Sequence, residues 1–489
     1  MPLFPLLRLP LFRRFSSPIL LLAALLIFPA MAHAQADSLP PPVARALQTA
    51  GVPAFAVAIF VQEVDARAPR LSVNAAAPMN PASVMKLLTT YAGLELLGPA
   101  YTWRTEVYAA GPIRDGVLTG DLVLKGYGDP KLGLEQFWLL LRQLRAKGLR
   151  EIRGDLVLDR AYFAAQPHDP ARFDNEPLRP YNVGPDALLL NYKSIRLDFA
   201  LDAADGSVTV SAEPALAQLE LVNLVKPGKG ACGSAWYDDI GMEFIPAGAS
   251  ARLILSGSYS VACGEKSRHV AVFDHPQFIA GVFRPLWSEL GGRFEGVVRE
   301  GGAPAGARLL ARAESPALAE VVREINKFSN NVMARQLYLT LGAETGKPPA
   351  RNAEANAALR AWLERKGLRI PELSIENGAG LSRSDRISAD SLARLLAAAW
   401  ASPVMPEFIA SLPLAGVDGT MRKRLAGDAI AGQTHVKTGY LEGVRALAGY
   451  VLDKNGKRVI VVFLANHPNA TAAKAAQDAL LSCVYDASC

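Results

Sequence analysis

The feature that most constrains the fold is a long β-rich segment between two parts of the chain that have a different pattern. From about Thr102 to Pro304, stretches such as RTEVYAA and GDLVLKG alternate with Gly, Asp and Pro, which predicts short strands joined by turns. The apolar run PAFAVAIFVQEV before this segment predicts a buried strand. Near the C-terminus, Asn455-Gly456 separates two further apolar runs, which is typical of a β-hairpin. We therefore expect an α+β fold in which distant ends of the chain close one sheet.

These patterns predict a domain interrupted by an insertion. Residues 35–101 and 305–489 would form one domain, and residues 102–304 would form one or two inserted lobes, with a second lobe nested at about 128–200. The chain has 489 residues, half of them hydrophobic, and is long enough to bury more than one core.

Residues 1–34 have the pattern of an export signal. Arg13 and Arg14 precede the apolar run at 19–30, and the small residues AHA follow at 32–34. The run is shorter than the ~20 residues that a membrane span needs, which favours a cleaved signal peptide over a transmembrane anchor. The arginine pair also occurs in twin-arginine signals, but the rest of that pattern is absent. We expect an exported, periplasmic protein without a transmembrane anchor after processing.

The charge and the histidines exclude several kinds of partner. The formal net charge is +6 and falls when the arginines of the signal are removed, and no basic runs occur. The six histidines are scattered, and neither Cys-x-x-Cys nor His-Glu-x-x-His occurs. We expect no nucleic-acid partner, no metal site and no cofactor.

The four cysteines predict two disulfide bonds, because they are an even number in a chain that we expect to be exported. The expected pairs are Cys232 with Cys263 and Cys483 with Cys489, since each pair closes a local loop.

Ser83 and Lys86 open the helix that follows the first strand, in NPASVMKLLTTYAGLELLG, and Gly98 ends it. Residues three apart share a helix face, so Ser83 Oγ and Lys86 Nζ can hydrogen-bond. Lys86 would act as a base if burial or a nearby positive charge kept it neutral. The alternative is that Ser83 is an N-cap and Lys86 a surface lysine. The apolar flanks and the absence of another Ser-x-x-Lys favour a nucleophile.

A second short motif is Ser329-Asn330-Asn331, at a break between two predicted helices, of which the first begins with Ser315 as its N-cap. Ser329 would relay a proton, and Asn331 would hold a substrate amide. Helix capping is the alternative for this motif.

The third motif, Lys437-Thr438-Gly439, lies on the strand before the hairpin. Lys437 and Thr438 would bind a substrate carboxylate, and Gly439 would let a ligand approach the backbone. The backbone N–H of Tyr440 would form an oxyanion hole with that of Ser83. The alternative is an edge-strand lysine that discourages aggregation.

Together the three motifs match, in order and placement, the set found in penicillin-recognising serine enzymes. A serine nucleophile activated by a histidine is disfavoured, because the sequence has no Gly-x-Ser-x-Gly elbow and no histidine stands out as a candidate base.

With these motifs the chain resembles the low-molecular-mass class C penicillin-binding proteins, the D-alanyl-D-alanine carboxypeptidases/endopeptidases of the S13 peptidase family. The resemblance runs from about Pro41 to the C-terminus and includes GAGLSRSD, LPLAGVDGTMRKRL and the long gap between Ser83 and Ser329. It implies a β-lactamase/transpeptidase-like domain with an antiparallel sheet flanked by helices. It also implies that Ser83 is acylated and Lys86 is its base.

The resemblance assigns further roles. Ser329 and Asn331 would complete the proton-transfer and substrate-holding group, while Lys437, Thr438 and the Tyr440 N–H would bind the terminal carboxylate and the oxyanion.

The resemblance also carries over to residues outside the motifs. Arg383 would bind the substrate side chain, unless it forms only a surface salt bridge. Glu176, or Asp174, and Tyr181 in the inserted lobe would contact a diaminopimelate side chain. The chain departs from the family where Tyr440 replaces a small hydroxyl residue and where ENGAG replaces DGSG.

We therefore expect hydrolysis of D-Ala-D-Ala ends of peptidoglycan stem peptides through an acyl-serine, with endopeptidase action on cross-links as a further expectation. β-Lactam antibiotics would be covalent inhibitors. One alternative is a β-lactamase or esterase on the same scaffold, which the insertion and the lack of a Glu-x-x-Leu-Asn segment disfavour. Another is a non-catalytic wall-binding protein, for which damaged motifs would be expected.

Overall fold

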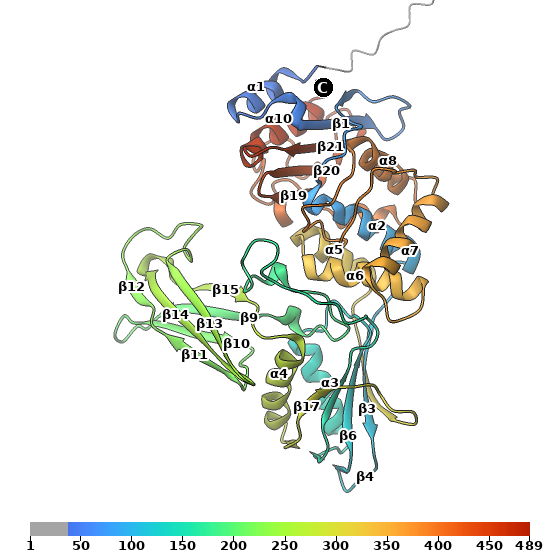
Figure 1. Ribbon diagram of the computed structural model, residues 1–489. Coiled ribbons are helices and arrows are strands. Elements are labelled where there is room, and N and C mark those ends of the chain that lie inside the picture. Colours follow the sequence, from blue (N-terminus) through green and yellow to red (C-terminus); the bar gives the residue numbers. More distant parts are fainter. Residues whose placement is uncertain (1–37) are drawn as a thin grey trace, which may run out of the picture. The chain divides into compact units, whose positions relative to one another are not determined.

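The computed structural model describes residues 38–489, so the expected signal peptide at 1–34 lies outside the described residues. An antiparallel sheet joins the two ends of this part of the chain in the strand order β19-β20-β21-β1-β2 (Figure 1). Its strands are β1 (Val57–Glu63), β2 (Leu71–Val73), β19 (Thr434–Leu441), β20 (Val444–Leu452) and β21 (Arg458–Asn466). The expected sheet of sequence-distant strands and the hairpin at Asn455-Gly456 are both confirmed.

Helices cover both faces of this sheet (Figure 1). In β1, Ala58 and Phe60 pack into one core, while Val57, Ile59 and Val61 pack into the other, as the two-residue period of a strand requires. The helices on one face are α1 (Pro41–Thr49) and α10 (Lys474–Tyr485). The opposite core contains α2 (Lys86–Leu97), α5 (Leu318–Phe328), α6 (Asn331–Thr345), α7 (Asn352–Arg365), α8 (Ala389–Trp400) and α9 (Met405–Ala410).

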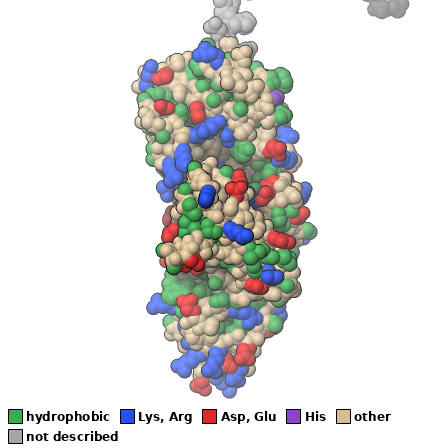
Figure 2. Space-filling model, turned by 90° about the vertical axis from the view of Figure 1, so that its left-hand side faces the viewer, with side chains coloured by type: hydrophobic (Ala, Val, Ile, Leu, Met, Phe, Trp, Pro, Cys, Tyr) green, Lys and Arg blue, Asp and Glu red, His purple; other side chains and the backbone are tan. Residues whose placement is uncertain are grey.

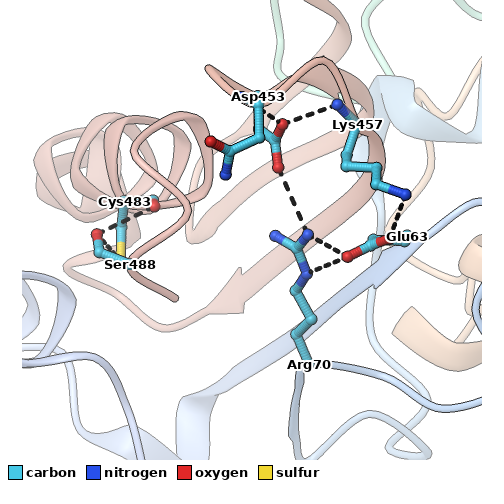
Figure 3. Close-up of polar contacts among 7 residues, drawn as sticks. Glu63, Arg70, Asp453, Lys457, Cys483 and Ser488 are labelled. Carbon is cyan, nitrogen blue, oxygen red and sulfur yellow. Dashed lines mark hydrogen bonds and ion pairs between the residues drawn. The ribbon is translucent and has the colours of Figure 1, made fainter.

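A charged cluster fixes the loop after β1 against the β20–β21 hairpin (Figure 3). The guanidinium of Arg70 pairs with Glu63 at the end of β1 and lies 3.4 Å from Asp453, whose side chain is fully buried. The other carboxylate oxygen of Asp453 accepts the backbone N–H of Lys457 at 2.8 Å. These contacts fix the turn between β20 and β21 against the end of β1 and the loop that follows it.

The β-rich segment contains four sheets, as the expected mainly β insertion requires. Two of them comprise β3 (Arg104–Ala110), β4 (Ile113–Arg114), β5 (Val117–Leu118), β6 (Asp121–Gly126), β7 (Glu151–Ile152), β8 (Leu156–Asp159), β16 (Arg293–Phe294), β17 (Val298–Glu300) and β18 (Arg308–Glu314). The other two comprise β9 (Ile195–Leu201), β10 (Val208–Glu213), β11 (Leu219–Asn223), β12 (Lys226–Gly228), β13 (Ile240–Ala247), β14 (Ser250–Ser260) and β15 (Lys266–Val270). Helices α3 (Leu134–Ala146) and α4 (His275–Glu289) pack into the core that these sheets share.

The strands between residues 195 and 270 form sheets of their own. Strands β7 and β8 add in parallel to β5 and β6 and so belong to the sheets formed by the flanking strands. Strand β9 pairs with β10 and β15.

Both expected disulfide pairs are confirmed. Cys232 is bonded to Cys263 in the insertion, and Cys483 of α10 is bonded to Cys489.

None of the helices within residues 38–489 has the length and hydropathy of a membrane-spanning segment. On the face drawn in Figure 2, basic and acidic side chains are interspersed over the surface.

Candidate active site

Ser83 lies in a short 3₁₀ turn, Ala82–Met85, and α2 begins only at Lys86. Neither helix has a side-chain cap at its N-terminus, so the capping alternative for Ser83 is excluded. The preceding residue, Ala82, has a φ of 46°, which is uncommon for a residue with a side chain. Its backbone N–H is held by Asn80 Oδ1 at 2.8 Å. The turn therefore presents Ser83 from a constrained backbone, as is common at functional sites.

Two glycines let other segments pack directly on this turn. A Cβ on Gly439 of β19 would lie 2.6 Å from the carbonyl oxygen of Pro81. A Cβ on Gly380, whose φ is +74°, would lie 1.9 Å from the carbonyl oxygen of Ala82. Both distances are shorter than van der Waals contact allows, so only glycine fits at either position.

The amine of Lys86 is fully buried and lies at the centre of the site. It is 2.9 Å from Ser83 Oγ, 2.6 Å from Asn331 Oδ1 and 2.5 Å from the carbonyl oxygen of Ala379. A neutral amine has two N–H donors and one lone pair. The amide oxygen and the carbonyl oxygen are acceptors only and take the two donors, so the lone pair is left for the hydroxyl proton of Ser83.

The surroundings favour the neutral form of Lys86. Burial lowers the pKa of its amine well below 10.5, and the nearby charges of Lys437 and Arg335 lower it further. Asp385 opposes them and raises this pKa. The buried amine is therefore suited to act as a base.

Ser329 and Asn331 lie at the junction of α5 and α6. Ser329 ends α5 in the left-handed conformation with a φ of 58°, and its Oγ accepts a hydrogen bond from Lys437 Nζ at 2.8 Å. Asn330, and not Ser329 or Asn331, caps α6 by accepting the N–H of Met333. Asn330 is therefore the capping residue of the motif. The side chains of Ser329 and Asn331 instead contact Lys437 and Lys86.

Lys437 is fully buried on β19, although β19 is an edge strand of the sheet. Its amine donates to Ser329 Oγ and to the carbonyl oxygen of Thr438, each at 2.8 Å. Burial lowers the pKa of this amine to about 7. A lysine that guards an exposed edge would point into solvent, so the alternative role for this residue is excluded.

The residues expected to bind the substrate side chain are only partly brought together. The Arg383 guanidinium lies 4.9 Å from the ring centre of Phe173 and donates to the carbonyl oxygen of Glu442 at 2.7 Å. Arg383 and Phe173 line a cavity of about 420 Å³, which is also lined by Arg335, one helical turn from Asn331. Phe173 comes from the inserted segment and was not among the residues expected from the sequence.

The Arg383 cavity does not include the side chains of Glu176, Asp174 and Tyr181. Glu176 Oε2 accepts from Arg179 at 3.2 Å, and the Tyr181 hydroxyl donates to Asp174 Oδ2 at 2.8 Å. Tyr181 reaches the motifs through its backbone, because its carbonyl oxygen accepts from Asn331 Nδ2 at 3.3 Å. None of these three carboxylate and phenol groups lines the Arg383 cavity.

Two buried charged residues near Lys86 were missed from the sequence. Arg335 lies one helical turn after Asn331 on α6 and donates to the carbonyl oxygen of Val183 at 2.6 Å. Asp385 is fully buried and accepts the N–H of Glu376 at 2.9 Å. The four-residue spacing from Asn331 was a usable signal for Arg335. Asp385 had no local signal beyond its place in GAGLSRSD.

Comparisons with known proteins show which family the chain resembles. The D-Ala-D-Ala carboxypeptidase 3 (S13) family matches residues 42–485. The D-alanyl-D-alanine carboxypeptidase of Actinomadura sp. (strain R39) is 32% identical over 417 residues, which cover 82% of this chain and 76% of that protein. The D-alanyl-D-alanine carboxypeptidase DacB of Haemophilus influenzae is 25% identical over 395 residues, or 80% and 81% of the two chains. The crystal structure of penicillin binding protein 4 from Haemophilus influenzae has a TM-score of 0.76 at 23% identity and covers 91% of this chain and 99% of its own.

Proposed function

Because the chain belongs to the D-Ala-D-Ala carboxypeptidase 3 (S13) family and is a serine-type D-Ala-D-Ala carboxypeptidase, we propose that Ser83 is its acylated nucleophile. The hydrogen bonds of Lys86 carry this proposal. Asn331 Oδ1 and the Ala379 carbonyl occupy both donors of the neutral amine, so its lone pair is directed to Ser83 Oγ. No histidine has to serve as the base.

The acylation step follows from this arrangement. Ser83 Oγ attacks the carbonyl carbon of the penultimate D-Ala while Lys86 takes the hydroxyl proton. The peptide C–N bond then breaks, and Lys86 gives up its proton to the leaving D-Ala nitrogen by way of Ser329, which is hydrogen-bonded to Lys437. Water then attacks the ester, the again neutral Lys86 takes a proton from that water, and it passes this proton to Ser83 Oγ as the acyl–oxygen bond breaks.

The remaining motif residues bind the substrate. The backbone N–H groups of Ser83 and Tyr440 stabilise the oxyanion, while Lys437 and Thr438 bind the terminal carboxylate. Gly439 keeps β19 close to the Ser83 turn. Asn331 Nδ2, which donates to the Tyr181 carbonyl oxygen at 3.3 Å, holds the substrate amide.

The Arg383 cavity takes the substrate side chain. Arg383 supplies charge to it, with Phe173 beneath the guanidinium. Asp174 and Tyr181 remain candidates from the inserted segment because they hydrogen-bond next to the Asn331 contact. Glu176 is the weaker candidate because it is paired with Arg179.

The wider proposal is that residues 1–34 direct the protein to the periplasm and that the enzyme acts on peptidoglycan stem peptides there. Residues 35–101 and 305–489 form the catalytic domain, and residues 102–304 form the insertion. The enzyme also cleaves peptide cross-links, and β-lactam antibiotics acylate Ser83 because they resemble its substrate.

Defined muropeptides test the proposal. The purified protein is incubated with a monomer that ends in D-Ala-D-Ala and with a cross-linked dimer, and the products are identified by mass. Loss of one D-Ala from the monomer, absent with Ser83→Ala, supports the carboxypeptidase mechanism, and conversion of the dimer to monomers supports the endopeptidase activity. Activity that survives in Ser83→Ala contradicts the assignment of the nucleophile. Rapid repeated hydrolysis of penicillin by the wild type would instead favour a β-lactamase.

A further inference from the structure

A second hydroxyl lies beside Thr438 at the mouth of the site. It belongs to Thr420, in the 3₁₀ turn Gly419–Met421, and Thr438 Oγ1 donates to Thr420 Oγ1 at 2.8 Å. Thr420 is exposed, and Thr438 is partly exposed, so both hydroxyls are open to a ligand. This turn is not part of the three motifs.

The turn that carries Thr420 is fixed to the end of α5. Gly419 has a φ of +55°, and a Cβ there would lie 2.5 Å from the carbonyl oxygen of Lys327, so the turn packs directly on the α5 backbone. The preceding residue, Asp418, pairs with the buried amine of Lys327 at 2.7 Å. Lys327 lies two residues before Ser329. Thr420 is therefore held by the same helix end that positions Ser329.

The pair of hydroxyls has unused donor capacity. Thr438 donates its proton to Thr420, while no hydrogen bond within residues 38–489 uses the Thr420 hydroxyl as the donor. A carboxylate has two oxygens that only accept, so two hydroxyls 2.8 Å apart match it as a pair. Hydrogen bonds to a charged acceptor are also stronger than those between neutral groups.

Other side chains on this part of β19 do not supply a second small hydroxyl. Strand alternation places Tyr440 on the same face as Thr438. Its ring lies 4.8 Å from the guanidinium of Arg445, the residue opposite it on β20. The phenol side chain is thus packed along β20 rather than beside the Thr438 hydroxyl.

We infer that Thr420 is a substrate-binding residue that, together with Thr438, binds the terminal carboxylate of the substrate and so sets the preference for a free C-terminal D-Ala. The inference rests on the proposed function. Carboxylate binding would break the Thr438–Thr420 hydrogen bond and let each hydroxyl donate to one carboxylate oxygen. Removal of one hydroxyl would therefore weaken the binding only of substrates that carry this charge.

Paired substrates test the inference. The kcat/KM of the full-length mature protein is measured on a peptide that ends in D-Ala-D-Ala and on the same peptide with a C-terminal amide. Thr420→Val should lower kcat/KM on the acid by roughly 10-fold or more, as expected for the loss of a hydrogen bond to a charged group. The kcat/KM on the amide should change by less than about 2-fold. Thr420→Ser should restore the preference for the acid. Thr209→Val, at an exposed threonine of β10, is the matched control and should leave both rates unchanged.

The outcomes separate this inference from the proposed function. An equal loss on acid and amide, or no loss on either, overturns the role of Thr420 while the carboxypeptidase mechanism stands. A wild-type protein that releases no D-Ala from the acid overturns both. If Thr420→Val melts far below the wild type, Thr420→Ala makes the same comparison with the smaller side chain.

Discussion

Lys86 Nζ and Asn331 Oδ1 form a hydrogen bond of 2.6 Å, although 245 residues separate them in sequence. The bond joins the start of α2 to the start of α6, on either side of the insertion. It also occupies one donor of the amine that we assign as the base. The protonation state of Lys86 should therefore respond to the charge at position 331.

Asn331→Asp should move the acidic limb of the activity profile to higher pH. A carboxylate beside Lys86 favours the ammonium form and raises the pKa of the amine, so the base is lost at a higher pH. The rate of acylation by a chromogenic β-lactam, measured across pH, gives this limb. Asn330→Asp is the matched control, because Asn330 caps α6 and aspartate caps equally well. If the acidic limb lies at the same pH in both variants, the contact between Asn331 and Lys86 does not influence the pKa of Lys86.

Asp385→Asn should move the same limb in the opposite direction. Burial raises the pKa of Asp385 to about 6, so above that pH the ionised group raises the pKa of Lys86. Asparagine keeps an acceptor for the Glu376 N–H but removes the charge. The same pH series measures the effect, with Asp390→Asn, at an exposed ion pair with Arg394, as the control. A shift to higher pH would show that Asp385 acts by another route.

Lys437→Met should make the folding stability less dependent on pH between about 7 and 10.5. The pKa of Lys437 is about 7 in the folded protein and 10.5 ordinarily, so in this range the unfolded chain binds a proton that the folded protein lacks. The free energy of unfolding of the wild type therefore rises with pH relative to the variant. Denaturant unfolding at pH 7 and 9.5 measures the difference, with Lys423→Met at an exposed lysine as the control. An equal difference at both pH values would mean that Lys437 remains charged.

Lys86→Met should slow acylation by about 10²- to 10⁴-fold, the usual range for a lost general base. Methionine has a similar length and no charge, so it fills the buried site. Stopped-flow or chromogenic assays of β-lactam acylation measure the rate. Lys193→Met removes a buried amine from the insertion and tests whether loss of any buried lysine has this effect. A variant of Lys86 that is acylated at the wild-type rate would exclude it as the base.

Local patterns predicted the parts of the site that local geometry decides. The three-residue spacing of Ser83 and Lys86 was sufficient to place their side chains together, and Asn455-Gly456 was sufficient to predict the hairpin. The choice between cap and nucleophile could not be made in this way. It depends on Asn80 and on Gly380 and Gly439, both of which are distant from Ser83 in the sequence.

Tertiary contacts overrode local patterns elsewhere. Ser315 was expected to cap the helix that follows it, but α5 begins at Leu318 with Ala317 at the N-cap, so that prediction was wrong. The Ser315 hydroxyl instead accepts the backbone N–H of Trp103 at 2.9 Å. Thr420 and Phe173 were missed for the same reason, because their significance comes from what packs beside them and neither belongs to a short motif.

Mass spectrometry of the peptide that contains Ser83, after brief exposure of the folded protein to penicillin, detects acylation of the nucleophile itself. We expect one penicilloyl group per chain, attached to Ser83 and absent from Ser83→Ala. An adduct on another residue, or an equal yield of adduct in Ser83→Ala, would contradict this expectation.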